Sequence, residues 1–334
     1  MSYLNNNEPL VSIIVPVYNS GDYIKGTLMR LLNQSYKNIE VVVVDDGSTD
    51  QTLKVINEIS YDGRLKLVQQ FHSGVSIARN TGMNNSSGKF ISFVDSDDFV
   101  SKDYVSVLMR PFLSKNNKSI VMSIGKFKTV DRPQNNFIDK KTMIEMNPSQ
   151  ALEQLLMQKD DTDVSLWSRI YRVSSLNGLR VNEGIVFEDL DYNVRYLAGL
   201  DDKSVVAFVD AVVLEYYQRT DSIMHRNFTD EEMTILQVVD NVTLAVENSD
   251  IGVRRALNNK LISTLAGVYS RSVIDDASYD KQMLLYHCLS ELSKNFTLKK
   301  PRTLKSVLIV MALHLGKSFS KIILCMAYKA TKKI

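Results

Sequence analysis

Short apolar runs alternate with amphipathic stretches over the first hundred residues. Mostly β-branched runs predict buried strands at residues 11–15, 39–44 and 65–68. Between the first two runs, apolar side chains recur at the spacing of one helical face, at Ile24, Leu28, Leu31 and Leu32. A strand, a helix and a strand in this order predict a βαβ unit. The run VVVV at 41–44 is typical of a parallel strand covered on both faces.

A fourth apolar run, FISFV at 90–94, ends directly in the acidic segment Asp95-Ser96-Asp97-Asp98. The first two strands are followed by the segment 16–19 and by Asp45 and Asp46. In an open α/β sheet, ligands bind at the carboxyl ends of the strands. We therefore expect these three loops to converge at one edge of the sheet.

The chain from Asp230 onward has a helical pattern, with apolar stripes at Leu236, Val239 and Val242 and at Leu257, Leu261, Thr264 and Leu265. Pro301 marks a break. After it, apolar residues share one helical face (Phe319, Ile322, Ile323 and Met326) and basic residues share another (Lys317, Lys321 and Lys332). A basic amphipathic helix of this kind lies in the headgroup layer of an anionic membrane or packs on the preceding part of the chain with solvated lysines.

Composition indicates an ordinary globular chain of 334 residues, 44% hydrophobic and 23% charged, enough for one large domain and an appendage. The net charge is +2, and it arises in the tail, because residues 292–334 hold no Asp or Glu. Cys288 and Cys325 cannot form a disulfide framework or a zinc site, which favours a reducing compartment. Neither a leader nor a spanning apolar run is recognisable, so we expect a cytoplasmic protein.

The acidic loops suggest a chemistry. Three carboxylates within 95–98 repel one another unless a cation lies between them, and Mg²⁺ or Mn²⁺ carrying a diphosphate fits because it needs only one or two protein carboxylates. A solvated turn at the strand end is the alternative.

In DDGSTD at 45–50, one acid suffices to cap the next helix, so Asp46 is free to accept a hydrogen bond from a nucleobase imide.

Several other classes are disfavoured. The first strand is not followed by GxGxxG or by GxxxxGK[ST], which argues against nicotinamide and P-loop chemistry. The adjacent acids of DDGST lack the spacing of the phosphatase motif Asp-x-Asp-Gly-Thr, and no glycine follows at the sixth position of an EF-hand.

Four segments in register, VSIIVPVYN, VVVVDDGSTD, GVSIARNTG and FISFVDSDD, closely resemble the GT-A glycosyltransferases of family 2. This resemblance implies an α/β fold of the GT-A type, a Rossmann-like, mostly parallel sheet with helices on both faces, followed here by a C-terminal helical region. It also implies a nucleotide-diphosphate-sugar donor, usually a UDP-sugar, a divalent Mn²⁺ or Mg²⁺ ion, and transfer with inversion at the anomeric carbon.

Matched position by position, the resemblance implies roles for the residues of these segments. Those that would bind the donor are Pro16 and Tyr18 at the base pocket, Asp46 on the uracil, Arg79 beside the base or phosphates, and Asp95 and Ser96 near the ribose or sugar. Asp97, with Asp95, would ligate the metal. His72 stands where relatives often have Asn, which puts its base contact in doubt.

The resemblance continues more loosely downstream. LWSRIY at 166–171 resembles a WNKLY segment, and Trp167 could offer a flat face to an acceptor sugar or belong to the core. Glu188 and Asp189 match the pair that carries the catalytic base, here at the first turn of an expected helix, although two acids at that place can simply cap it. YYQR at 216–219 resembles YYYR, so Arg219 would clamp the diphosphate or lie on the surface.

We expect a catalytic domain at 1–228, with a nucleotide-binding half to about 110 and an acceptor-binding half from about 111, and a helical region at 229–334 with a basic amphipathic tail from about 301. The expected activity is inverting transfer from a nucleotide-sugar to a glycan or lipid-linked acceptor in bacterial surface polysaccharide synthesis, at the inner face of the membrane and without nucleic acid. The alternatives are a decayed nucleotide-sugar-binding protein and a nucleotidyltransferase, which would want a Lys or Arg in the loop after the first strand.

Overall fold

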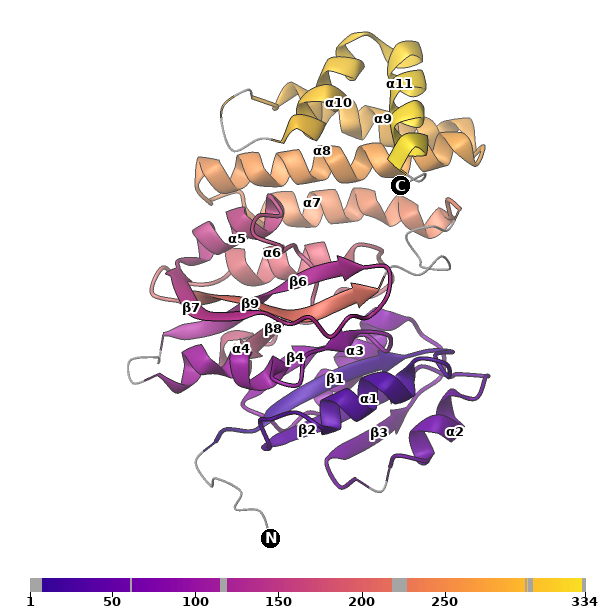
Figure 1. Cartoon of the computed structure of the whole chain (residues 1–334). Coiled ribbons are helices and arrows are strands. Elements are labelled where there is room, and N and C mark those ends of the chain that lie inside the picture. The colour runs from indigo at the N-terminus through magenta and orange to yellow at the C-terminus, as the bar shows by residue number, and fades with distance from the viewer. Residues whose placement is uncertain are drawn as a thin grey trace. The chain divides into compact units, whose positions relative to one another are not determined.

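The computed structural model describes residues 8–60, 62–114, 119–217, 227–297, 299 and 303–331. Within these residues the strands form one mixed sheet in the order β3-β2-β1-β4-β8-β6-β9-β5, with β7 paired to β9 (Figure 1). The first four strands along the chain are parallel neighbours: β1 (Val11–Val17), β2 (Ile39–Asp45), β3 (Leu65–Gln69) and β4 (Phe90–Phe93). All four strands predicted from the apolar runs are confirmed.

The second half of the sheet is mixed. The strand β8 (Arg169–Arg172) lies antiparallel between β4 and β6 (Ile120–Val130), although it is far from both in sequence. The strand β9 (Val205–Tyr217) runs parallel to β6 and antiparallel to β5 (Phe99–Val100) and β7 (Asp139–Met146).

Both faces of the parallel strands are covered, as the run VVVV predicts. The helices of this part are α1 (Ile24–Leu32), α2 (Thr52–Asn57), α3 (Val75–Asn84) and α4 (Tyr104–Leu113). Val41 and Val43 pack with the predicted stripe of α1, whereas Val42 and Val44 pack with Ala78 of α3, because successive strand residues point to opposite faces. The approach of α3 is close: a Cβ on Gly82 would lie 2.3 Å from Ile14 Cγ2.

The chain divides into two compact units. One contains residues 1–148, 160–183 and 200–218, and therefore the sheet; the other contains 149–159, 184–199 and 219–334. Two segments that precede residue 228 thus group with the C-terminal residues, and the domain boundary expected there stays a prediction.

The second unit is helical. Its helices are α5 (Pro148–Leu156), α6 (Glu188–Ala198), α7 (Ile235–Ala245), α8 (Ile251–Ile274), α9 (Tyr279–Lys294), α10 (Leu304–His314) and α11 (Lys317–Thr331), and short 3-10 turns occur at η1 (Val173–Ser175) in the first unit and η3 (Asp230–Thr234) in the second. The predicted apolar stripe of α8 is buried at Leu257, Leu261 and Leu265. The break predicted at Pro301 lies outside the described residues.

In the described parts of the chain, no helix combines the length and the apolar character needed to cross a bilayer.

Cys288 and Cys325 are free thiols. Burial raises the pKa of the Cys288 thiol to about 11.

Candidate functional site

The loops after β1, β2 and β4 meet, because their strands are parallel neighbours in register. Val17 pairs with Asp45 of β2, and the Val94 amide donates to the Ile14 carbonyl. Asn19 ties the first two loops: its amide donates to Ser48 Oγ at 3.0 Å, and its Oδ1 accepts from the Thr49 amide at 2.8 Å. The convergence expected from the sequence is therefore present.

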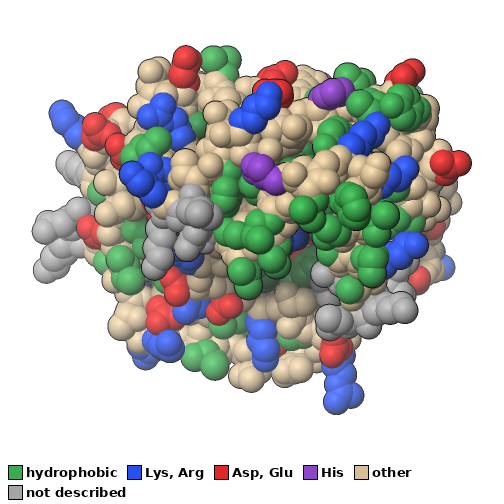
Figure 2. Space-filling model, turned by 90° about the horizontal axis from the view of Figure 1, so that it is seen from above, with side chains coloured by type: hydrophobic (Ala, Val, Ile, Leu, Met, Phe, Trp, Pro, Cys, Tyr) green, Lys and Arg blue, Asp and Glu red, His purple; other side chains and the backbone are tan. Residues whose placement is uncertain are grey.

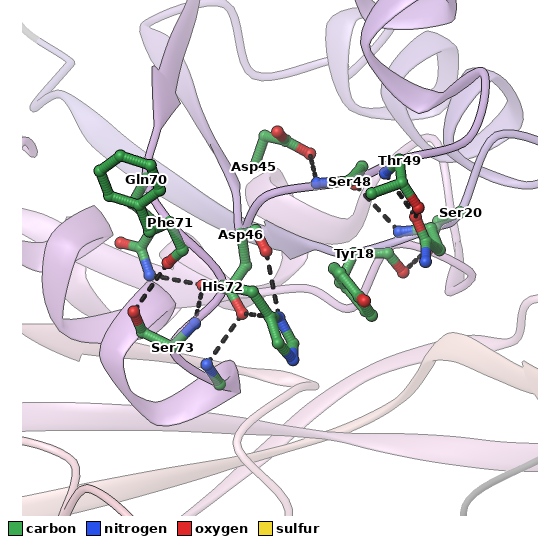
Figure 3. Close-up of polar contacts among 12 residues, drawn as sticks. Tyr18, Ser20, Asp45, Asp46, Ser48, Thr49, Gln70, Phe71, His72 and Ser73 are labelled. Atoms are coloured by element: carbon green, nitrogen blue, oxygen red, sulfur yellow. Dashed lines mark hydrogen bonds and ion pairs between the residues drawn. The ribbon is translucent and has the colours of Figure 1, made fainter.

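Asp46 organises the segment that leads into α3 (Figure 3). Its Oδ1 accepts from the Ser73 amide at 2.9 Å and from Gln70 Nε2 at 2.7 Å, and its Oδ2 accepts from the Gly74 amide at 2.8 Å. The His72 Nδ1 lies 2.9 Å from the same Oδ2. Asp46 is buried, so its carboxylate shapes the 70–74 loop, and its contact with a nucleobase stays a prediction.

Tyr18 and His72 form an aromatic pair beside Asp46. Their ring centroids lie 4.0 Å apart with 23° between the planes, and 44% of Tyr18 is exposed. Phe71, next to His72, is almost wholly exposed. The sequence indicated Tyr18 and His72 separately but neither their stacking nor Phe71, because nothing local in the sequence signals a contact across 54 residues. An exposed, flat, partly polar surface of this kind suits a planar ring.

The three carboxylates of the acidic segment 95–98 differ in burial. Asp98 is buried, and its Oδ2 accepts from the Asp95 amide at 3.0 Å. Burial, and then the charges of Asp95 and Asp97, raise the pKa of Asp98 well above its ordinary value. Asp95 and Asp97 are half-buried, so the loop presents these two acids and turns the third inward.

Arg79 of α3 supplies the opposite charge. Its Nη2 donates to Asp95 Oδ1 at 3.0 Å, and its side chain is only 7% exposed. Two further contacts hold the acidic loop. Thr27 Oγ1 donates to the Ser96 carbonyl at 2.9 Å, and Ser96 Oγ lies 2.8 Å from Ser20 Oγ. The ion pair between Arg79 and Asp95 thus offsets part of the repulsion expected among the three acids.

The donor set at this loop fits a hard divalent cation of limited protein coordination. Among the residues that the structure describes, no three His, Cys, Asp or Glu side chains are grouped to hold a metal. Asp95 and Asp97 provide carboxylate oxygens for one or two coordination positions, which is what Mg²⁺ or Mn²⁺ takes from a protein when phosphate and water supply the rest.

Asn80, next to Arg79, holds a distant segment. Its Nδ2 donates to the Val181 carbonyl at 2.9 Å and to Glu183 Oε1 at 3.1 Å, and its Oδ1 accepts from the Val181 amide at 3.0 Å. In the sequence, Asn80 was noted only as part of the GVSIARNTG segment. Its hydrogen bonds to Val181 and Glu183, more than 100 residues away, were not predicted.

Glu188 and Asp189 occupy the first turn of α6, as expected. The N-cap of that helix is Phe187, in the left-handed region at φ +61°, and it makes no side-chain capping hydrogen bond. Glu188 and Asp189 therefore lie inside the helix and not at its N-cap position. In the first turn, the helix dipole still stabilises their negative charge. Asp189 Oδ1 lies 2.7 Å from the Leu190 amide.

Trp167 belongs to the core. It is 8% exposed, Phe127 meets it edge-on at 4.4 Å, and Tyr216 stacks on it at 5.8 Å. Of the two alternatives for Trp167, the structure shows the place in the core. Contact with an acceptor sugar stays a prediction. Pro16 is buried within β1, and Arg219 lies outside the described residues.

The chain is similar to known glycosyltransferases. Residues 12–180 match the model of the family described as glycosyl transferase family 2. The glycosyltransferase GlyA of Streptococcus pneumoniae is 29% identical over 299 residues, which cover 85% of this chain and 42% of GlyA. The chain spans about half the length, or less, of this and the next curated relatives that it matches.

Two solved structures share the fold. TarS 1-349 of Staphylococcus aureus in complex with UDP-GlcNAc has a TM-score of 0.68 at 20% identity, covering 97% of this chain and 92% of that one. The mannosyltransferase PcManGT of Pyrobaculum calidifontis, in complex with GDP-Man and Mn²⁺, has a TM-score of 0.51 at 16% identity, with 97% and 85% covered. The expected GT-A fold followed by C-terminal helices is confirmed, and the chain belongs to glycosyltransferase family 2.

Proposed function

We propose that the protein transfers a sugar, with inversion, from a nucleotide-diphosphate-sugar to a hydroxyl of a glycan or lipid-linked acceptor. The donor is a UDP-sugar, and the reaction serves bacterial surface polysaccharide synthesis at the inner face of the cell membrane. One observation carries the proposal: the half-buried pair Asp95 and Asp97 lies in a loop that is hydrogen-bonded to the loop of Tyr18.

The donor half of the proposal follows from the first unit. The base would lie against the Tyr18–His72 pair, where Asp46 fixes the loop. Asp97, with Asp95, would hold Mn²⁺ or Mg²⁺, and the ion would neutralise the charge that grows on the leaving diphosphate. The ion pair with Arg79 orients the Asp95 carboxylate. TarS, solved with UDP-GlcNAc, and PcManGT, solved with GDP-Man and Mn²⁺, share the fold, which supports a nucleotide-sugar donor and a divalent metal.

The acceptor half rests on Asp189. An inverting transfer needs a carboxylate that takes the proton of the attacking hydroxyl. Asp189 is proposed for this role because it lies in the first turn of α6, in the Glu-Asp pair that matches the family. Glu188 orients Asp189 or meets the acceptor.

The test combines a metal series with one substitution. In the wild-type protein with Mn²⁺, a panel of UDP-sugars should include one that raises the melting temperature and is slowly hydrolysed. Asp97→Ala should lower hydrolysis and transfer of that donor by a factor on the order of 100, and an excess of chelator should do the same to the wild type.

Asp103→Ala is the matched control, because Asp103 is exposed and makes no side-chain cap hydrogen bond at the start of α4. Its turnover should equal that of the wild type. Full activity of the wild type in excess chelator would remove the metal from the proposal. Donor binding without turnover of any donor or acceptor would identify a decayed binding protein.

A further inference from the structure

The helices α10 and α11 each have one face fixed inward. Both pack on α8: Ser306 of α10 is buried and donates to Asn259 Oδ1, and the guanidinium of Arg271 lies 5.8 Å from the ring of Tyr328 of α11. Ser320 and Leu324 of α11 are also buried. Because these contacts set the rotation of each helix, the opposite faces are directed to solvent.

The outward faces are apolar. On α10 and the residue after it, the side chains more than half exposed are Leu304, Leu308, Met311 and Leu315, at helical spacing. On α11 they are Phe319, Ile322 and Met326. Together these seven residues are called the α10–α11 surface. Figure 2 shows the face on which α10 and α11 lie in Figure 1, where hydrophobic side chains gather beside a hollow with Lys and Arg side chains among and around them.

The charged side chains on the described residues of α10 and α11 have one sign, whereas Figure 2 also shows Asp and Glu side chains elsewhere on this face. The stretch from Leu292 to the end of the chain contains no Asp or Glu, and Lys305, Lys321 and Lys329 are exposed on the same two helices. A partner for this surface must therefore accept bulky apolar side chains and carry negative charge.

We propose that the α10–α11 surface docks on the face of an anionic lipid bilayer, with its apolar side chains among the acyl chains and its lysines at the phosphates. A second copy of the chain fits less well, because a two-fold interface would bring the same lysines of both copies together. No described helix is long and apolar enough to cross the bilayer, so the helices lie on it. The inference rests on the proposed membrane location and deepens it, since both helices, and not the tail helix alone, form the contact.

Vesicle sedimentation of the full chain tests the inference. The protein should bind vesicles of roughly 7:3 phosphatidylcholine and phosphatidylglycerol, and bind pure phosphatidylcholine at least about tenfold less. The double variant Leu308→Asp/Met311→Asp should lower binding to anionic vesicles by about tenfold or more. Leu244→Asp, at an exposed leucine of α7 outside the surface, is the matched control and should bind like the wild type.

A charge variant separates the two parts of the contact. Lys321→Gln/Lys329→Gln keeps the apolar face and should weaken binding to anionic vesicles and reduce its dependence on salt. Melting temperatures of all variants should match the wild type, since the changed side chains are exposed.

Three outcomes would overturn the inference: equal binding of the Leu308→Asp/Met311→Asp variant, equal binding to neutral and anionic vesicles, or a loss of self-association in that variant with no vesicle binding by the wild type. Donor hydrolysis, assayed without vesicles, keeps the two proposals apart. Hydrolysis without vesicle binding contradicts the docking alone, and vesicle binding without turnover contradicts the transferase alone.

Discussion

At the scale of single residues, burial decides what each aspartate of the loops can do. Asp46 is surrounded by backbone amides and holds a loop, Asp98 is turned inward, and Asp95 is held by Arg79. These three aspartates therefore have different structural roles. The Asp-x-Asp pattern indicated a cation site, but only burial distinguishes the two half-buried acids, Asp95 and Asp97, from the third.

Asp189→Asn tests the proposed base. The amide keeps the shape of the side chain but cannot take a proton, so donor affinity should persist while kcat falls by a factor on the order of 100 or more. Titration calorimetry with UDP and Mn²⁺ gives the affinity, and a coupled assay for UDP release gives kcat.

Asp202→Asn, at an exposed aspartate in the turn after α6, serves as the control and should leave both quantities unchanged. Glu188→Gln separates orientation from proton transfer, because an orienting residue should lower kcat less than Asp189→Asn does. An Asp189→Asn variant with wild-type kcat would place the base elsewhere.

At the scale of elements, hydrogen bonds between distant segments position the site. The side chain of Asn80 makes three hydrogen bonds to the segment 181–183, which precedes α6 in the chain. Helix α3 therefore carries Arg79 toward the acidic loop and Asn80 toward this segment on adjacent residues.

Asn80→Ala should destabilise the fold, because it leaves the buried amide and carbonyl of Val181 without their partner. The expected loss in the free energy of unfolding is about 1–3 kcal/mol, measured by urea denaturation, with a fall in kcat at 25 °C. Asn84→Ala, four residues later on α3 and exposed, removes a single contact with Arg180 and should change that free energy by less than about 0.5 kcal/mol. Equal effects of the two substitutions would show that the Val181 contacts do not anchor this segment.

At the scale of the whole molecule, stability should depend on pH through Glu40. Burial alone would raise the pKa of this carboxyl, but hydrogen bonds from the Ser12 hydroxyl, from Ser87 and from the Gly88 amide outweigh it and lower the pKa. A carboxyl with a lowered folded-state pKa stabilises the fold above its ordinary pKa of 4.5, and the contribution is lost as the pH falls through the folded-state value.

The Glu40→Gln variant should therefore have a lower urea midpoint than the wild type near neutral pH, and the two midpoints should converge as the pH falls below about 4. Glu58→Gln removes an exposed ion pair with Lys25, 3.6 Å long, and should show little difference at any pH. Parallel curves for the wild type and Glu40→Gln over the whole range would contradict this role.

Much of the fold was predictable because its signals are local. Periodicity places β1, β2, β3, β4 and α1 correctly, and the acids after β2 and β4 were recognised as loop residues at one sheet edge. The place of β8 was not predictable, since an antiparallel strand between β4 and β6 depends on pairing across 45 or more residues. The apolar face of α11 was recognised in the sequence, and the apolar face of α10 was not. The residues of α10 also recur at helical spacing, but only the packing of α10 on α8 shows that this face is exposed.

The sequence by itself determined the secondary structure of the parallel half, the acidic loops and the family, because periodicity and motif order are properties of neighbouring residues. Only the tertiary structure decided that Asp98 turns inward, that His72 stacks on Tyr18 and that Asn80 holds Val181. These facts follow from burial and from hydrogen bonds between distant segments, and both arise only when the elements pack.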